Sequence, residues 1–261
     1  MGAIGADDIP AADWQGRTID DAYCAACEHA ALRAAGSCES GRSCLHDVYA
    51  RRIDRFFRHH PALANGHLAA PYFELRAIAA RYADVFRLTP LMSDEDETVR
   101  LQVALRVPQR LLQRMVADPH REVRIRVAHR LAPEQLMALV NDADYQVRAI
   151  VAKRAPEGLL PLLMHDADLQ VRQEVARRLP MPALWRLGSD AAAEVRRIVA
   201  ARLPVALLDG LAYDADWTVR WEVAGRAVGA TLQRLAEDAE PEVRERARER
   251  VGHRQQETSH G

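Results

Sequence analysis

Four cysteines lie within one short window of a chain of 261 residues, and none occurs elsewhere in it. Their spacing is Cys24-x₂-Cys27-x₁₀-Cys38-x₅-Cys44. Four thiolates suit a structural zinc ion or an iron–sulfur cluster. Zinc ribbons usually present two close cysteine pairs, whereas a cubane cluster tolerates one close pair with scattered partners. The spacing therefore favours iron–sulfur, leaves zinc open, and argues against four unrelated thiols.

The first two cysteines are expected on one helix. Thr18 can cap this helix and Gly36 can end it. Cys24 and Cys27, three residues apart, would then share a face of the helix.

The last two cysteines lie in a loop rich in glycine and serine, GSCESGRSC, which is free to fold back toward the first pair. A second helix is predicted over residues 46–59, stopped by Pro61. Aromatic residues are available to roof the site or to build the core: Tyr23, Tyr49, Phe56 and Phe57.

Downstream of this window, residues 88–251 repeat one pattern of 24 residues seven times without an insertion, and the last copy is slightly clipped. Leucine opens every copy: Leu88, Leu112, Leu136, Leu160, Leu184, Leu208 and Leu232. Aspartate stands at position 7: Asp94, Asp118, Asp142, Asp166, Asp190, Asp214 and Asp238. Arginine follows valine at position 13: Arg100, Arg124, Arg148, Arg172, Arg196, Arg220 and Arg244.

Each copy predicts one α-helix and one tighter turn. Positions 12, 16, 17 and 20 are apolar or small, which is the spacing of one helix face. Asp144, Asp168 and Asp216 at position 9 can cap helices that run over positions 10–20. Positions 1 and 4 suggest a single turn of 3₁₀-helix. No L-x-L alternation recurs, so we expect no β-sheet, and each copy must stack on its neighbours to bury its apolar face.

The arginine at position 13 points into the apolar arc of the helix. A buried arginine needs a charged partner, and the aspartates at position 7 are the candidates. We therefore predict a ladder of Arg–Asp pairs along the stack, within or between copies. A stripe of arginines that grips an acidic ligand is the alternative.

Composition narrows the class of protein. The net charge of −1 gives no general attraction to nucleic acid or to an anionic membrane, so neither is an expected partner. No apolar run reaches the roughly 20 residues that cross a membrane, and the N-terminus has no secretory pattern. A cytoplasmic location with reduced thiols is expected. No phosphate loop, serine elbow or paired-carboxylate motif points to an enzyme.

These observations divide the chain into four parts. Residues 1–62 form a small helical domain around the cysteines. Residues 63–87 are a decayed copy that caps the array or joins it to that domain, with Ala70 where the aspartate would be. Residues 88–251 are the seven copies, and residues 252–261 are a polar tail predicted to be disordered.

The unit L-x-x-L-x-x-D-x-D-x-x-V-R-x-x-V-A-x-R-L-P resembles the leucine-rich repeat variant family over residues 88–251. The resemblance implies a right-handed superhelical solenoid of alternating α- and 3₁₀-helices. Fuller members of that family carry an N-terminal four-cysteine domain that holds a [4Fe-4S] cluster. By position, the resemblance assigns Cys24, Cys27, Cys38 and Cys44 as its ligands.

The family resemblance supplies a cofactor but no reaction. We therefore expect a scaffold that binds one or more protein partners, with the cluster structural or redox-sensing. The alternatives are an electron-transfer protein that docks a redox partner and a structural zinc site in the same cysteines. The nearby histidines His29, His46, His59 and His60 show no base–nucleophile spacing. His29 and His46 are expected at the surface or in packing.

Overall fold

A computed structural model describes residues 9–259 of the chain, with side chains described as far as residue 252. The described residues form helices and no strand; three isolated β-bridges occur near the cysteines. No helix among them is long and apolar enough to cross a membrane. The predicted all-helical fold with alternating α- and 3₁₀-helices is confirmed.

The chain divides into two compact units, one ending at Ala132 and one beginning at Pro133, and each is described by itself. The first unit contains α1 (Asp21–Ala25), α2 (Ala30–Ala34), α3 (Ala50–His59), η1 (Pro61–His67), α4 (Phe73–Tyr82), η2 (Val85–Arg87), η3 (Thr89–Ser93), α5 (Glu97–Arg106), α6 (Gln109–Leu112), η4 (Gln113–Met115) and α7 (Arg121–Arg130). The second contains η5 (Pro133–Leu139), α8 (Tyr145–Arg154), η6 (Glu157–Leu163), α9 (Leu169–Arg178), η7 (Ala183–Ser189), α10 (Ala193–Arg202), η8 (Val205–Tyr213), α11 (Trp217–Ala224), α12 (Gly229–Leu235) and α13 (Pro241–Ser259).

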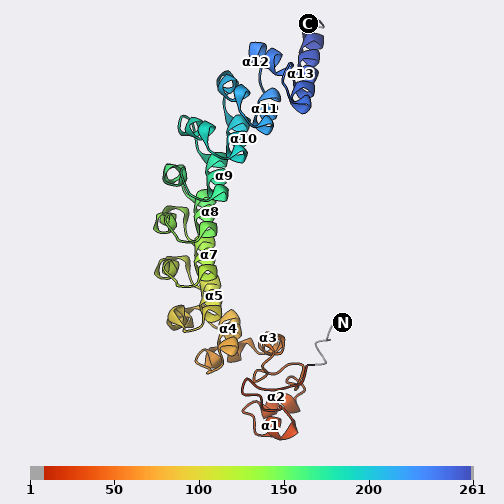
Figure 1. The fold of residues 1–261 in the computed structure, drawn as a ribbon. Helices are drawn as coiled ribbons and strands as arrows, with labels where there is room; N and C mark the ends of the chain where they lie inside the picture. Colours follow the sequence, from red (N-terminus) through yellow and green to blue (C-terminus); the bar gives the residue numbers. More distant parts are fainter. Residues whose placement is uncertain (1–8, 260–261) are drawn as a thin grey trace. The chain divides into compact units, whose positions relative to one another are not determined.

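Within each unit, the longer α-helices of successive copies lie against one another as one layer, and the shorter segments form a second layer (Figure 1). The predicted helix face builds the core between the layers: in α9 and its C-cap, Val171, Val175, Ala176 and Leu179 have no exposed area. Leu160 at position 1 of its copy is equally buried in the second layer. Burial of this face against neighbouring copies is what stabilises a unit of only 24 residues.

The helix starts follow the predicted aspartate caps. Asp144, Asp168 and Asp216 each accept a hydrogen bond from the backbone N–H two residues on, at 2.8–2.9 Å. These bonds satisfy amides that have no partner inside the helix.

The second layer is not uniformly 3₁₀-helical. The segments QRLL of α6 and GATLQRL of α12 are α-helical, which corrects the prediction of one 3₁₀ turn in every copy. Both are rich in strong helix formers with no proline or glycine in the interior. The 3₁₀ segments η6, η7 and η8 contain interior glycine or proline: Gly158, Pro161, Gly188 and Gly210. The segment η5, PEQLMAL, contains neither in its interior and is also 3₁₀-helical, so composition alone does not decide the helix type.

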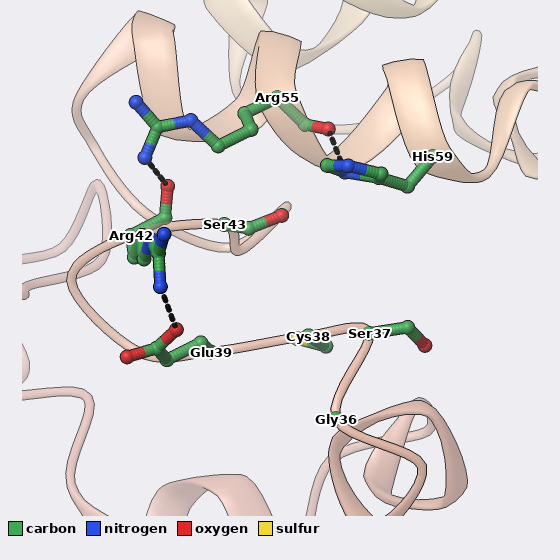
Figure 2. A pocket seen from close by; sticks show the side chains of 8 residues that line it. All are labelled: Gly36, Ser37, Cys38, Glu39, Arg42, Ser43, Arg55 and His59. Carbon is green, nitrogen blue, oxygen red and sulfur yellow. Dashed lines mark hydrogen bonds and ion pairs between the residues drawn. The ribbon is translucent and has the colours of Figure 1, made fainter.

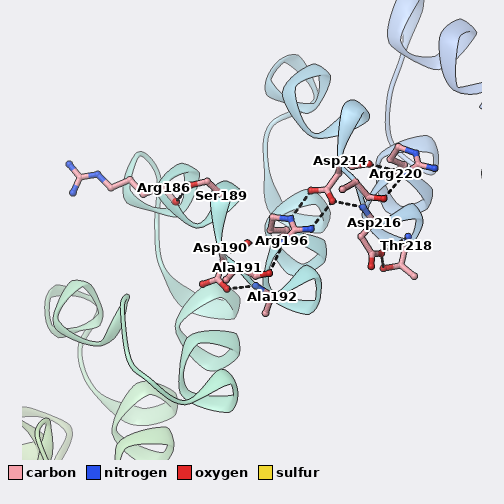
Figure 3. Close-up of polar contacts among 11 residues, drawn as sticks. Arg186, Ser189, Asp190, Ala191, Ala192, Arg196, Asp214, Asp216, Thr218 and Arg220 are labelled. Atoms are coloured by element: carbon pink, nitrogen blue, oxygen red, sulfur yellow. Dashed lines mark hydrogen bonds and ion pairs between the residues drawn. The ribbon is translucent and has the colours of Figure 1, made fainter.

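The Arg–Asp ladder is confirmed, and the pairs join successive copies (Figure 3). Arg196 donates from Nε and Nη2 to the two carboxylate oxygens of Asp214 at 2.7 and 2.8 Å. Its third nitrogen, Nη1, donates to the backbone oxygen of Asp190, at position 7 of its own copy. The same two-point pairing, 18 residues apart, recurs at Arg76–Asp94, Arg100–Asp118, Arg148–Asp166, Arg172–Asp190 and Arg220–Asp238.

A second recurrent arginine, at position 19, has a role that the sequence pattern did not predict. Nη1 of Arg202 donates to the carbonyl oxygens of Ala176 and Leu179 at 2.7 and 2.8 Å. These carbonyls lie at the C-terminal end of the preceding copy's helix, where no intrahelical donor is available. The positive charge also complements the negative end of that helix dipole. Arg202 therefore caps the helix of the copy before it. The same contact to the preceding helix is made by Arg106, Arg130, Arg178, Arg226 and Arg250.

The end of the array differs from the prediction. Residues 252–259, predicted to be disordered, continue helix α13; residues 260–261 lie outside the described residues. Gly252 stands at position 21, where four copies carry the proline that prevents continuation of a helix. Without that proline, the polar residues that follow are compatible with further helical turns.

Arg196→Ala tests the ladder, and Arg197→Ala is its matched control because this neighbouring side chain is exposed. Loss of Arg196 leaves Asp214 largely buried without its charge partner. We expect the free energy of unfolding of Arg196→Ala to fall by about 3 kcal/mol, at the low end of the range for broken buried pairs. Arg197→Ala should change it by less than about 0.5 kcal/mol. Urea unfolding followed by circular dichroism measures both; equal losses would contradict the ladder.

Acid should weaken the array. Burial alone would raise the pKa of Asp166, but hydrogen bonds from Arg148 and the Asp168 amide outweigh it and hold that pKa below its usual range. A carboxylate with a lowered folded pKa contributes its full stabilisation above the unfolded pKa of about 3.9 and loses it as the pH falls below that value. We expect the free energy of unfolding to decline below about pH 4. Asp166→Asn should be less stable at neutral pH and decline less steeply; an unchanged slope would refute this assignment.

Candidate metal centre

The segment that carries the first two cysteines is two short helices and not the single helix predicted. Asp20, and not Thr18, caps α1 by accepting the Tyr23 amide at 2.8 Å. Helix α1 ends at Ala25, so Cys27 lies outside it, and the Sγ of Cys27 accepts the His29 amide at 3.4 Å. This hydrogen bond to sulfur lies in the segment between the two helices. The regular α-helical hydrogen bonds begin again in α2.

Gly36 ends α2, as predicted. Its φ of +71° is left-handed, a conformation that glycine adopts without strain. In this turn the Ser37 amide reaches back to the carbonyl oxygen of Leu32 at 2.9 Å. The chain then reverses into the loop that carries Cys38 and Cys44.

Side-chain hydrogen bonds hold this loop and the segment that follows it. The Ser40 hydroxyl donates to the backbone oxygen of Ile19 at 2.5 Å. Beyond the loop, Arg52 donates to Asp47 at 3.0 Å, and both side chains are almost wholly buried. Arg52 also donates to the carbonyl oxygens of Ile9 and Pro10. These contacts fix the backbone between Cys38 and Cys44 and the backbone that follows Cys44.

The structure brings the four cysteines together on one small cavity. Its other lining residues are Ile19, Tyr23, His29, Arg33 and His46. Cys24 and Cys44 are buried, whereas Cys27 and Cys38 are half-buried. Cavity-facing thiols from two separate segments form a donor set that suits a thiophilic metal centre.

Hydrogen bonds and burial set the proton affinities of these thiols. Burial raises the pKa of Cys24 and of Cys27. A hydrogen bond between Cys38 and Cys44 lowers the pKa of Cys38 and, with burial, raises that of Cys44. Binding of a metal centre would release the protons that these thiols hold.

Backbone amides also point at the sulfurs. The amide of His29 donates to Cys27, and the amide of His46 interacts in the same way with Cys44. Each amide lies two residues after its cysteine. Such N–H···S contacts stabilise the negative charge that a thiolate keeps when it binds a metal.

The aromatic residues divide between the cavity and the core. Tyr23 lines the cavity and packs edge-on against His46, with ring centroids 6.0 Å apart. Phe56 and Phe57 have no exposed area and lie in the core below it. Tyr49 does not line the cavity but lies beside Arg52, whose guanidinium carbon is 5.6 Å from the centroid of its ring.

Sequence reasoning missed His29 and His46, which it placed at the surface or in packing. Both line the cysteine cavity. The signal that could have found them is the repeated pattern Cys-x-His, at Cys27–His29 and Cys44–His46. His59 and His60 do not line this cavity; Nδ1 of His59 donates a hydrogen bond to the Arg55 carbonyl oxygen, and His59 lines a neighbouring pocket.

That neighbouring pocket opens beside Cys38 (Figure 2). The loop forms one wall, where Arg42 pairs with Glu39 at 3.3 Å. Helix α3 forms the other wall, and its Arg55 donates to the Arg42 carbonyl oxygen at 2.9 Å. Cys38 lines both the pocket and the cysteine cavity, so the pocket brings exposed surface to this cysteine.

Two family models match separate parts of the chain. A family model described as LRV protein FeS4 cluster matches residues 11–66, and one described as leucine rich repeat variant matches residues 145–168. A solved structure of a leucine-rich repeat variant with a novel repetitive structural motif is 46% identical with a TM-score of 0.82. That match covers 86% of this chain and 96% of the other.

A curated relative of this chain, from Rhodobacter capsulatus, is described as an uncharacterized 27.7 kDa protein in the nifB 3′ region. It is 49% identical over 96 residues. The match covers 37% of this chain and 38% of that relative.

Proposed function

Because this chain belongs to the leucine-rich repeat variant family, we propose that it is a scaffold for protein–protein interaction with an iron–sulfur cluster in its N-terminal domain. Cys24, Cys27, Cys38 and Cys44 are the proposed ligands of a [4Fe-4S] cluster. The cluster is either structural or a redox sensor whose oxidation state alters how the repeat array binds its partner.

The convergence of all four thiols on one cavity is the observation that carries the cluster proposal. Amide hydrogen bonds to Cys27 and Cys44 support it, because iron–sulfur potentials and stability depend on such contacts to sulfur. The match of residues 11–66 to an FeS4 domain supports iron over zinc.

Exposed aromatic residues of the second unit support the scaffold proposal. Trp185, Tyr213 and Trp221 are 44%, 68% and 36% exposed. Tyr213 and Trp221 each lie beneath an arginine, with guanidinium carbons 3.5 and 3.4 Å from the ring centroids of these residues. Aromatic and arginine side chains are the residues most enriched where proteins bind one another.

Electron transfer to a docked redox protein is the second candidate. The pocket beside Cys38 favours it, because it brings solvent-accessible surface to one proposed cluster ligand. The measurement that separates the two is voltammetry: electron transfer requires a reversible one-electron couple in the range of known clusters. If the cluster is lost on reduction and no reversible couple is seen, electron transfer is excluded and the structural or sensing role remains.

The anaerobically purified chain should be brown, with a broad visible absorption band and four iron atoms per chain. Alanine at each of the four cysteines in turn should remove this absorbance. Glu39→Ala is the matched control, because this exposed side chain is adjacent to Cys38 but offers no thiol. A colourless protein with one zinc ion would show that the four cysteines bind zinc and not a cluster. A stable four-iron cluster in Cys44→Ala would show that the ligand set is wrong.

The scaffold proposal predicts that Trp185→Ala combined with Trp221→Ala will abolish capture of a partner from lysate of the source cells. Phe86→Ala, which removes a side chain 75% exposed in the first unit, is the control and should leave capture intact. Quantitative mass spectrometry of cross-linked complexes measures the difference. Equal capture by the wild-type protein, the double variant and the control would contradict a role for these two tryptophans in partner binding.

Redox sensing is tested by comparing the captured partners before and after oxidation of the cluster. Identical partners in both states would exclude it.

A further inference from the structure

A second group of metal-binding side chains lies beside the cysteine cavity. Glu28 and His29 belong to the segment between α1 and α2, His46 precedes α3, and His67 ends η1. Three segments separated in the sequence thus bring three imidazoles and one carboxylate together. None of these residues is among the proposed cluster ligands.

The geometry of the group is that of a ligand set. One ligand atom from each of Glu28, His29 and His67 lies within 4.8 Å of the other two. Nε2 of His29 is 3.5 Å from Oε1 of Glu28, and Nε2 of His46 is 3.8 Å from the same oxygen. In a tetrahedral site with metal–nitrogen bonds of about 2.1 Å, ligand atoms lie about 3.4 Å apart. Glu28 is exposed and can rotate to close the remaining distance.

One nitrogen of the group is without a hydrogen bond. Nε2 of His29 is buried and has no hydrogen-bond partner in the structure, because its approach to Glu28 does not meet hydrogen-bond geometry. A buried polar atom without a partner costs about 1–3 kcal/mol. The ring packs against Phe56 and His67, at centroid distances of 5.5 and 5.8 Å. A metal ion bound by Nε2 would remove this penalty.

The group also borders open space. Glu28, His46 and His67 line a cavity of about 320 Å³, and His46 lines the cysteine cavity as well.

We propose that Glu28, His29 and His67 bind one divalent transition-metal ion of the Zn²⁺ or Fe²⁺ class. Two imidazoles and a carboxylate are a ligand set that proteins use for these ions. The cavity beside His46 leaves room for a fourth ligand, either His46 itself or a water molecule. This site stands whether the cysteines hold an iron–sulfur cluster or zinc, because it uses none of the thiols.

Cobalt titration of the full-length protein, with its cysteine site already loaded, tests the proposal. We expect one Co²⁺ to bind per chain, and X-ray absorption at the cobalt edge to show nitrogen and oxygen ligands without sulfur. His67→Gln and Glu28→Gln should both abolish binding of equimolar Co²⁺. His59→Gln is the control, because this histidine lies in the other pocket.

The visible and far-ultraviolet spectra of each variant show whether the cysteine site and the fold are intact. Glu28 is exposed, so its variant keeps the test informative if His67→Gln fails to fold. Sulfur in the cobalt shell, no bound cobalt, or unchanged binding in Glu28→Gln would each overturn the proposal. Failure of the cysteine centre would appear instead as lost colour or lost iron in the protein before cobalt is added.

Discussion

The two-point ion pair between an arginine of one copy and the aspartate of the next is the contact on which the array depends. Each arginine uses its remaining nitrogen to bind backbone oxygens of its own copy, as Arg196 does with Asp190. Each aspartate also accepts an amide of its own turn, as Asp214 does from Asp216. One ion pair therefore fixes two turns and the offset between two copies. Apolar packing alone would tolerate sliding, whereas this pairing requires one register and explains why the period of 24 residues is kept without insertions.

Most of the repeat could be predicted because its physical causes are local. Helix limits follow from the apolar spacing and from caps such as Asp168. The offset of the ladder could not be predicted, since it depends on how two copies stack. The role of Arg202 was equally hidden, because its partners are main-chain carbonyls that any residue can supply. Sequence patterns record side-chain partners and leave backbone partners unmarked.

The cysteine site shows the same division. The clustering of four cysteines indicated a shared centre, and the structure places them on one cavity. The break between α1 and α2 escaped prediction, because the sequence around Cys27 has good helix propensity and the competing contact is an amide bonded to sulfur. His67 joins Glu28 and His29 from a segment with no motif of its own, and only the folded chain shows that these three residues meet.

The carbonyl-capping arginines give each unit a direction. The helix that ends near Ala176 receives its cap from Arg202, which follows 26 residues later, and the partner of Arg172 also lies in the following copy. Within a unit, each copy is therefore completed by the copy that comes after it. As the chain emerges from the ribosome, a copy acquires its full set of polar contacts only when its successor has been synthesised. Folding during translation then trails synthesis by about one repeat. In a chain that stops early, the last copy lacks the polar contacts that its successor would supply.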